Sequence, residues 1–351
     1  MRDYLYRLAT DKQRGFLASL IKALLFILAI LYGLVVRILI LFYRLKPYRL
    51  HCKVVSVGNI TLGGTGKTVL VEYLARYLKN QGHKVAILSR GYKRKVTKSP
   101  SHQVTSHETM GDEPYMLSKK LKDIPVIVDA NRIKAAKRAI EDYKVDTVIL
   151  DDGFQQWRII KDLEIVAIDA SEPFGNRWLI PRGILRQPLS SLRRAEVLVL
   201  TKTNLNPDIV EIKDFLTALN SSAIIIEATH EPRGFYRIDQ PDELLNTDVF
   251  KGKTVSAFSG IGDPYSFENL LGSLGINIGL SFIFPDHYPY SQKDIDRIIR
   301  SSKDKGIETI VTTEKDAVRL SRLPIFVLKI ELKIVKNEER LHNRLLRLYR
   351  G

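Results

Sequence analysis

The chain has 351 residues, of which 45% are hydrophobic, and its formal net charge is +16. This length allows two domains with hydrophobic cores and an additional segment. A single cysteine, Cys52, excludes an internal disulfide and a cysteine zinc cluster. The charge predicts an anionic partner such as nucleic acid, anionic lipid or a phosphorylated small molecule. No alternation of basic and aromatic residues favours single-stranded nucleic acid, so we expect no nucleic-acid partner.

An apolar stretch, residues 16–43, lies near the N-terminus and is interrupted only by Lys22 and Arg37. Residues 1–50 carry nine Lys or Arg and two Asp, so +7 of the charge excess flanks this stretch. A spanning helix needs ~20 apolar residues, so the length and the basic flanks predict membrane association through this segment. A single span, a helix in the membrane interface and a buried hairpin of a soluble domain remain alternatives.

From residue 51 onward, apolar strand patterns alternate with helical patterns. Expected strands cover residues 51–58, 84–89, 124–128, 145–150, 163–169 and 195–201, and expected helices cover 66–80, 112–122 and 131–143. Such alternation predicts a parallel sheet covered on both faces. The fold class is therefore α/β.

A glycine-rich turn between the strand 51–58 and the helix 66–80 predicts a P-loop. Backbone N–H groups of such a turn and of the helix start bind phosphate, while the lysine reaches the β- and γ-phosphates. The usual pattern GxxxxGK[ST] has glycine at its first position, where this chain has threonine. The predicted ATP-binding residues are Thr61, Leu62, Gly63, Gly64, Thr65, Gly66, Lys67 and Thr68.

Two adjacent carboxylates, Asp151 and Asp152, follow the apolar strand 145–150. Ligands in open α/β sheets bind at the carboxyl ends of strands. A strand-end aspartate beside a P-loop is the Walker-B arrangement for Mg²⁺. We therefore predict a metal site of Thr68 with Asp151 or Asp152, and the sequence leaves open which aspartate contacts the metal.

Further candidates lie at loop positions. Asp112 and Glu113 begin a helix, where they could serve only as capping residues. His287 follows an apolar strand in the sequence FPDHYPY, where flanking prolines restrict the loop. Basic residues gather in two places, a loop from Arg90 to Lys95 and a set that predicts anion binding: Arg182, Arg186, Arg193 and Arg194.

A second unit is expected from about residue 231, with a strand at 233–238 and further alternation through 309–313. Residues 337–350 predict an amphipathic helix that is capped by Asn337 and buries Leu341, Leu345 and Leu348. We therefore expect three consecutive parts: a membrane-associated helical segment (1–50), a P-loop kinase domain (51–230) and a second α/β domain (231–351).

Eight motifs occur in the order typical of one enzyme family: SVGNITLGGTGKT, LSRGYKRK, GDEPYML, LDDGFQ, FGN…LIPRGILRQPL, AFSGIGDP, FPDHYPYS and TTEKDAVRL. With these motifs the chain resembles the tetraacyldisaccharide 4'-kinases, which phosphorylate a lipid A precursor. The resemblance covers nearly the whole chain. It includes the threonine at the first position of the P-loop.

The resemblance implies a function, a fold and a location. It implies transfer of the ATP γ-phosphate, with Mg²⁺, to the 4'-hydroxyl of tetraacyldisaccharide 1-phosphate, giving lipid IVA. It implies two α/β/α domains joined by a two-stranded linker, with the active site in the cleft. It also implies an enzyme on the cytoplasmic face of the bacterial inner membrane, with membrane lipids and a glycolipid substrate as partners.

The resemblance also assigns residues. The catalytic aspartate falls on Asp112, its histidine partner on His287, and the P-loop lysine on Lys67. Phosphoryl transfer needs mainly positioning and charge neutralisation, so Asp112 would accept the hydroxyl proton and His287 would orient it. We expect the second domain to close over the active site, so that this pair is divided between the domains. Arg90, Glu113 and Arg186 are further candidates for substrate contacts.

Three positions, in two of the motifs, depart from the family pattern. The family often has histidine where this chain has Gln156, and alanine and glutamate where it has Arg182 and Gln187. The missing carboxylate at Gln187 weakens any metal or substrate role at that position. Two other functions are compatible with the residues alone: a membrane-associated P-loop ATPase that drives transport or assembly of a partner, and a nucleic-acid NTPase.

Overall fold

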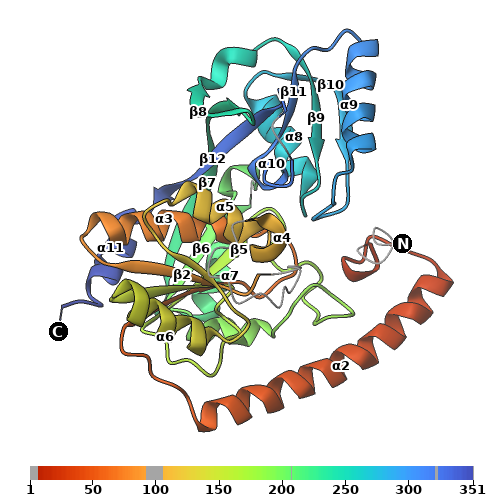
Figure 1. Ribbon diagram of the computed structural model, residues 1–351. Coiled ribbons are helices and arrows are strands. Elements are labelled where there is room, and N and C mark those ends of the chain that lie inside the picture. The colour runs from red at the N-terminus through yellow and green to blue at the C-terminus, as the bar shows by residue number, and fades with distance from the viewer. Residues whose placement is uncertain (1–6, 92–105, 207, 321–322, 351) are drawn as a thin grey trace. The chain divides into compact units, whose positions relative to one another are not determined.

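The computed structural model describes residues 7–91, 106–206, 208–320 and 323–350 (Figure 1). The described chain divides into two compact units, each an α/β structure. Unit 1 contains residues 1–90, 131–229 and 333–351, and unit 2 contains residues 91–130 and 230–332. The α/β class expected from the sequence is confirmed.

This division differs from the three consecutive parts expected from the sequence. Residues 91–130 belong to unit 2, although the sequence places them in the P-loop domain, and residues 333–351 return to unit 1. The apolar alternation of a chain predicts which segments form strands, but not which sheet each segment joins. The strands β7 and β12 carry the chain from one unit into the other, because a unit boundary falls inside each of them.

Unit 1 is built on a parallel sheet with the strand order β7-β6-β5-β1-β4-β2. Figure 1 shows α3 on one face of this sheet and α6 on the other. The strands β1, β2, β4 and β6 are almost entirely buried, as expected for a sheet covered on both faces. The elements are β1 (Lys53–Gly58), α3 (Lys67–Asn80), β2 (Val85–Ser89), α6 (Arg132–Tyr143), β4 (Thr147–Asp151), β5 (Leu163–Asp169), η1 (Leu189–Arg194), β6 (Val197–Thr201), η2 (Thr203–Leu205), α7 (Ile209–Leu219) and β7 (Ile224–Arg237).

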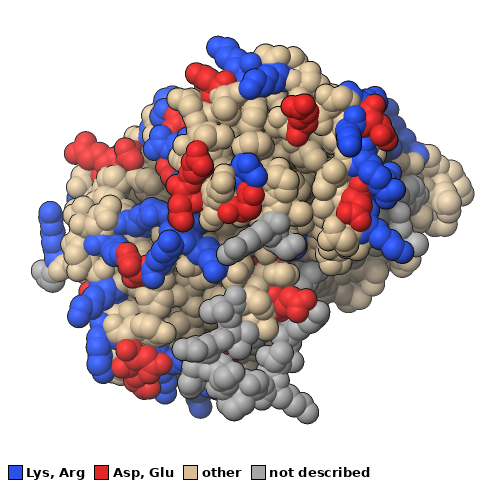
Figure 2. Space-filling model, turned by 45° about the horizontal axis from the view of Figure 1, so that its top comes forward, with Lys and Arg blue, Asp and Glu red and all other residues tan. Residues whose placement is uncertain are grey.

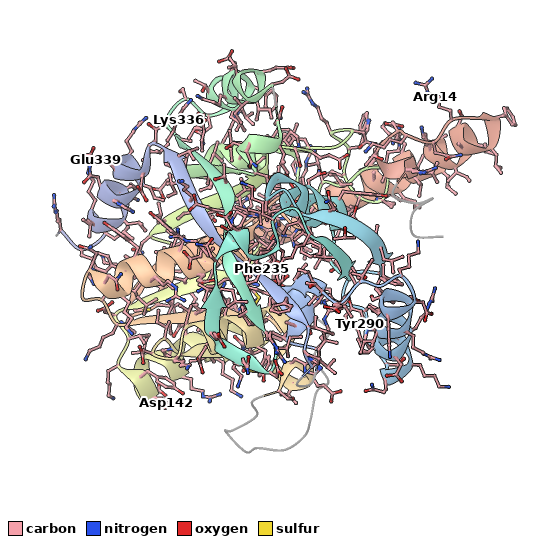
Figure 3. The ribbon with its side chains drawn as sticks, turned by 90° about the horizontal axis from the view of Figure 1, so that it is seen from above. Arg14, Asp142, Phe235, Tyr290, Lys336 and Glu339 are labelled. Carbon is pink, nitrogen blue, oxygen red and sulfur yellow. The ribbon has the colours of Figure 1, made fainter. Side chains whose placement is uncertain are left out.

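Unit 2 contains a second parallel arrangement with the strand order β10-β9-β11-β12. One apolar cluster includes Phe235 (labelled in Figure 3), Phe267 and Leu271, and a second includes Ile295 and Ile298 of α9. These clusters give the unit its own hydrophobic core. The elements are α4 (His107–Met110), α5 (Asp112–Lys120), β3 (Val126–Val128), β8 (Gln240–Leu245), η3 (Thr247–Phe250), β9 (Thr254–Ser259), α8 (Pro264–Ser273), β10 (Asn277–Ile283), α9 (Gln292–Asp304), β11 (Ile310–Thr313), α10 (Glu314–Ala317) and β12 (Phe326–Lys336).

The apolar stretch near the N-terminus forms one long helix, α2 (Phe16–Leu45). By length and composition it is able to cross a membrane, and only 17% of its most apolar window is buried against the protein. Several contacts attach α2 to the rest of unit 1, among them an aromatic pair and a hydrogen bond. Phe26 packs edge-on against Trp178, and the Tyr32 hydroxyl donates to the carbonyl of Arg186 at 3.0 Å.

The C-terminal helix α11 (Glu338–Leu346) packs on unit 1 through Leu341, Leu345 and Leu348, as the sequence predicted. The predicted cap by Asn337 is wrong. Its backbone has a φ of 64° and its side chain caps no helix N–H group; instead Nδ2 donates to the carbonyl of Ile225. The helix is fixed further by aromatic stacking, because the His342 ring lies 3.9 Å from the ring of Tyr77 in α3.

Acidic and basic side chains alternate over the face of the molecule that Figure 2 shows. On this face the positive excess is not gathered into one large patch.

Candidate active site

The glycine-rich turn joins β1 to α3, the order a P-loop requires. Gly63 and Gly66 have φ angles of 111° and 74°, which favour glycine because no Cβ is present. Gly66 directly precedes α3, whose first residues are Lys67 and Thr68. The turn therefore presents a helix N-terminus, an ammonium group and a hydroxyl at one place.

Thr61 stands where most P-loops have their first glycine, and its surroundings explain why. It forms an antiparallel bridge to Leu185, and the neighbouring amide of Leu62 donates to the carbonyl of Ile184 at 2.8 Å. The backbone of Thr61 is thus paired like a strand and has no positive φ. A side chain is tolerated at this position because the loop begins to curve only at Gly63.

The predicted acidic pair lies at the carboxyl end of β4, which pairs with β1 in the sheet. Asp151 is buried and accepts a hydrogen bond from Ser89 Oγ at the end of β2 at 2.9 Å. Asp152 has a φ of 56°, and its Oδ1 lies 3.9 Å from Lys67 Nζ. The structure therefore brings the two aspartates and the P-loop lysine of unit 1 to the same edge of the sheet.

Arg186 binds directly to this acidic pair. Its guanidinium donates to both carboxylate oxygens of Asp152, at 3.0 and 2.6 Å, and also contacts Asn59 and Gln155. Burial would raise the pKa of Asp152, but the Arg186 hydrogen bonds and the nearby charge of Lys67 lower it to about 2. Asp152 is thus an anion at neutral pH.

The side chains at this strand edge fit a magnesium ion. Mg²⁺ prefers oxygen ligands, keeps several waters and is usually held by one or two carboxylates together with substrate phosphates. Asp151, Asp152 and the Thr68 hydroxyl provide such oxygens. Within the described ranges no cluster of three or more His, Cys, Asp or Glu residues forms a metal cage of its own.

Unit 2 contains the second predicted group. His287 Nδ1 lies 2.7 Å from Asp112 Oδ2, although the two residues are 175 positions apart in the chain. Asp112 is the first residue of α5, and His287 lies in the loop between β10 and α9. The amide of His287 donates to the carbonyl of Gly260, which holds the residue at a φ of 61°.

Positive charges surround the Asp112 carboxylate. Arg319 Nε lies 3.3 Å from Asp112 Oδ2, and Lys315 Nζ lies 3.2 Å from both Glu113 and Asp286. Burial would raise the pKa of Asp112, but the His287 hydrogen bond and the charges of Arg319 and Lys315 hold it below its usual value. Asp112 Oδ1 makes no hydrogen bond to any residue that the structure describes. That oxygen is available to accept a proton.

The pair is not divided between the domains, which corrects one expectation from the sequence. Asp112 and His287 both belong to unit 2, because the segment 91–130 packs there. The expected domain of residues 51–230 assumed that each domain is one continuous stretch of the chain. The acid–imidazole pair is therefore preformed within one unit and needs no domain closure to assemble.

The remaining candidates have varied surroundings. Arg90 is exposed, and most of the basic loop that it begins, residues 92–105, lies outside the described residues. Gln187 is fully buried and accepts a hydrogen bond from Arg194 at 3.2 Å. Sequence reasoning missed four side chains that contact the predicted residues: Ser89, Asn59, Gln155 and Arg319. For Arg319 the available signal was the charged motif TTEKDAVRL.

Comparisons with known proteins show which family the chain resembles. A family model described as tetraacyldisaccharide-1-P 4'-kinase matches residues 21–350. A tetraacyldisaccharide 4'-kinase from Halothermothrix orenii is 35% identical, with 95% of this chain and 94% of that protein covered. One from Syntrophus aciditrophicus is 38% identical, covering 82% of each. The crystal structure of LpxK from Aquifex aeolicus in complex with ATP has a TM-score of 0.76 and 32% identity, covering 94% of this chain and 99% of that one.

Proposed function

The chain belongs to the tetraacyldisaccharide-1-P 4'-kinase family. We propose that the P-loop, the acidic pair and the Asp112–His287 pair carry out the reaction of that family. It is an ATP-dependent kinase of lipid A biosynthesis. The reaction transfers the γ-phosphate of ATP to the 4'-hydroxyl of tetraacyldisaccharide 1-phosphate and forms lipid IVA.

Unit 1 binds the nucleotide in this proposal. The turn from Thr61 to Gly66 and the start of α3 bind the phosphates through backbone N–H groups. Lys67 neutralises charge on the β- and γ-phosphates. Thr65 Oγ1 supports this assignment, because it is buried and has no hydrogen-bond partner among the described residues. A polar atom of this kind within a glycine-rich loop is suited to a bound phosphate oxygen.

Asp151, Asp152 and Thr68 would hold Mg²⁺, with Arg186 orienting the Asp152 carboxylate. When bound, the ion would neutralise charge that develops on the phosphate oxygens. Arg186 places its positive charge beside the same carboxylate. It is therefore better placed to set the position of Asp152 than to bind the acyl-sugar directly.

Unit 2 supplies the proton acceptor. His287 donates its Nδ1–H to Asp112 Oδ2, which leaves Asp112 Oδ1 to accept the proton of the 4'-hydroxyl. The pKa of Asp112 is low, so the group is ionised when the substrate arrives. The transition state of phosphoryl transfer is loose, so a weak base that takes the proton late is sufficient. The 2.7 Å contact between His287 and Asp112 is the observation that carries this assignment.

The acyl chains of the substrate lie in a bilayer, and α2 offers a way to work there. We infer that α2 associates with the cytoplasmic face of the inner membrane through its exposed apolar side chains. The basic flanking residues would meet anionic headgroups. Holding the enzyme at the surface raises the effective concentration of a substrate confined to the same membrane.

One assay tests the reaction. The purified chain is given ATP, Mg²⁺ and tetraacyldisaccharide 1-phosphate in detergent, and we expect the 1,4'-bisphosphate to form. A membrane-associated ATPase would instead hydrolyse ATP without the lipid acceptor and leave it unphosphorylated. Release of phosphate with no phosphorylated lipid would therefore favour that alternative and contradict the kinase assignment.

A further inference from the structure

Helix α5, which carries Asp112, is fixed within unit 2 by three ion pairs to one short segment. The segment is Glu314–Arg319, called the 314–319 segment below. Lys120 pairs with Glu314 at 3.2 Å, Glu113 with Lys315 at 3.2 Å and Asp112 with Arg319 at 3.3 Å. These ion pairs are distributed along the helix, from its last turn to its first residue. The 314–319 segment therefore sets the position of α5 and of its first carboxylate.

Arg319 also contacts the loop that carries His287. Its Nη1 donates to the carbonyl of Tyr288 at 2.8 Å, and its Nη2 lies 3.3 Å from the carbonyl of Gly260. The same Gly260 carbonyl accepts the amide of His287 at 3.0 Å. One guanidinium thus contacts Asp112, the residue that follows His287, and the backbone group that His287 itself binds.

A buried carboxylate orients this guanidinium. Asp316 is fully buried and accepts from Arg319 Nη2 at 2.7 Å, from the Tyr290 hydroxyl at 2.9 Å and from the amide of Gly260 at 3.0 Å. Tyr290, labelled in Figure 3, lies just before α9, and its ring centroid is 5.5 Å from the guanidinium carbon. The side chain of Arg319 is only 4% exposed. Its planar group of donors is therefore held in one orientation before substrate binds.

The backbone of His287 needs such support. Its φ of 61° lies in the left-handed region, which residues other than glycine rarely adopt without compensating contacts. Arg319 contacts the carbonyls of Tyr288 and Gly260, and Asp316 accepts from the amide of Gly260, so both hold backbone groups that border His287. Removal of the guanidinium would leave the carbonyl of Tyr288 without this donor and would free the loop to relax.

We propose that Arg319 is a positioning residue, which holds the Asp112 carboxylate against His287 and fixes two backbone carbonyls, that of Tyr288, which follows His287, and that of Gly260, which accepts the His287 amide. The inference rests on the proposed function, because it assigns a role in phosphoryl transfer through Asp112. Arg319 itself does not accept or donate the transferred proton. It acts by fixing the geometry of the pair that does.

A pH profile separates this role from a merely structural one. The groups that face Asp112 are His287, Arg319 and Lys315, and the last of these is shared with Glu113 and Asp286. Removing the positive charge of Arg319 raises the pKa of Asp112, because that charge holds the pKa below its usual value. The base is active when ionised, so the acid limb of kcat/KM moves to higher pH.

The test compares Arg319→Gln and Arg319→Lys with wild type, with Arg233→Gln as the matched control. Arg233 lies in the same unit and pairs with Glu331 at 2.7 Å, but it is half exposed and contacts none of these residues. We expect Arg319→Gln to lower kcat by ~10–100-fold with the KM for ATP within twofold of wild type. Arg319→Lys keeps the charge but lacks the planar donors, so kcat falls less and the acid limb stays near that of wild type.

A double-mutant cycle completes the test. Because Arg319 acts through Asp112, adding Arg319→Gln to Asp112→Asn should change the residual rate by less than twofold. The inference is overturned if Arg319→Gln folds and keeps the kcat of wild type. It is also overturned if Arg319→Gln lowers kcat as much in the Asp112→Asn background as in wild type. If Arg319→Gln does not fold, the test uses Arg319→Lys, whose ammonium still pairs with Asp316. A wild-type kcat of Arg319→Lys would then overturn the inference. Failure of the wild-type chain to phosphorylate the lipid would overturn the proposed function, and this inference with it.

Discussion

Two glycines allow the P-loop strand and the acidic turn to approach each other. A Cβ at Gly58, the last residue of β1, would lie 2.5 Å from Phe154 Cβ and 2.7 Å from its amide nitrogen. A Cβ at Gly153 would meet Ser56 Oγ at 2.6 Å. Neither neighbour is the flexible end of a long side chain. The spacing between the phosphate loop and Asp152 thus depends on two missing methyl groups.

We predict that Gly58→Ala destabilises the protein by about 1–3 kcal/mol, the usual cost of overpacking a closed core. The control is Gly272→Ala in α8, where an added Cβ has no atom within 4 Å. Because alanine is the better helix former, this control should gain up to about 1 kcal/mol. Urea unfolding of both variants measures the difference. Equal stabilities would show that the loop adjusts without strain.

For single residues, the sequence identified the functional side chains of the P-loop and the acidic pair, but it did not show which distant residues contact each other. Glycines, the lysine and the acidic pair were identifiable from their order, because a P-loop is a local structure. The contact between Asp112 and His287 was not deducible from residue patterns, since 175 positions separate them; it was expected only from the family resemblance. The cap at Asn337 was predicted from residue type, but a positive φ prevented it.

Helix α2 is the element that distinguishes this chain from a soluble P-loop enzyme. Its 30 residues span about 45 Å, longer than the ~30 Å hydrocarbon layer. Its buried residues are the three small ones Ala18, Ala29 and Val36. Its large apolar residues are mostly exposed, so the helix lacks the protein cover that a core helix has.

Replacing Leu24, Leu31 and Ile38 of α2 by glutamine should release the protein from membranes. These side chains are 60%, 53% and 55% exposed, and burial in lipid contributes ~1.5 kcal/mol or more for each. The three losses together lower vesicle partitioning by about a thousandfold. Flotation with anionic vesicles measures it. The control carries glutamine at Val210, Leu244 and Tyr265, which are exposed apolar residues outside α2; equal flotation of both triple variants would exclude α2 as the anchor.

Most helices and strands with a strong periodic pattern were predicted well, whereas two strands at positions set by pairing with other strands were not. The strands around β1 and the helices α3 and α6 lie within a few residues of their expected ranges. The strands β8 and β12 were missed. The strand β8 is largely exposed and contains Pro241, so its sequence lacks an apolar pattern. The strand β12 alternates apolar with charged residues from Leu328 to Ile334, a strand pattern that was overlooked, and it pairs with β11.

For the whole molecule, the two units divide the chemistry. Every predicted nucleotide and metal residue lies in unit 1, whereas Asp112, His287 and Arg319 lie in unit 2. Each unit has apolar clusters of its own. We therefore expect nucleotide binding to be separable from proton acceptance.

We predict that Lys67→Ala weakens ATP binding at least tenfold, because it removes the charge that faces the β- and γ-phosphates. Asp112→Asn and His287→Gln should leave the ATP dissociation constant within twofold of wild type while kcat falls by ~10²–10⁴. Titration of a fluorescent ATP analogue, followed by single-turnover transfer to the lipid, measures the two effects on the same samples. If Asp112→Asn weakened ATP binding as much as Lys67→Ala does, the carboxylate would be part of the nucleotide site. Its role as proton acceptor would then need to be reassigned.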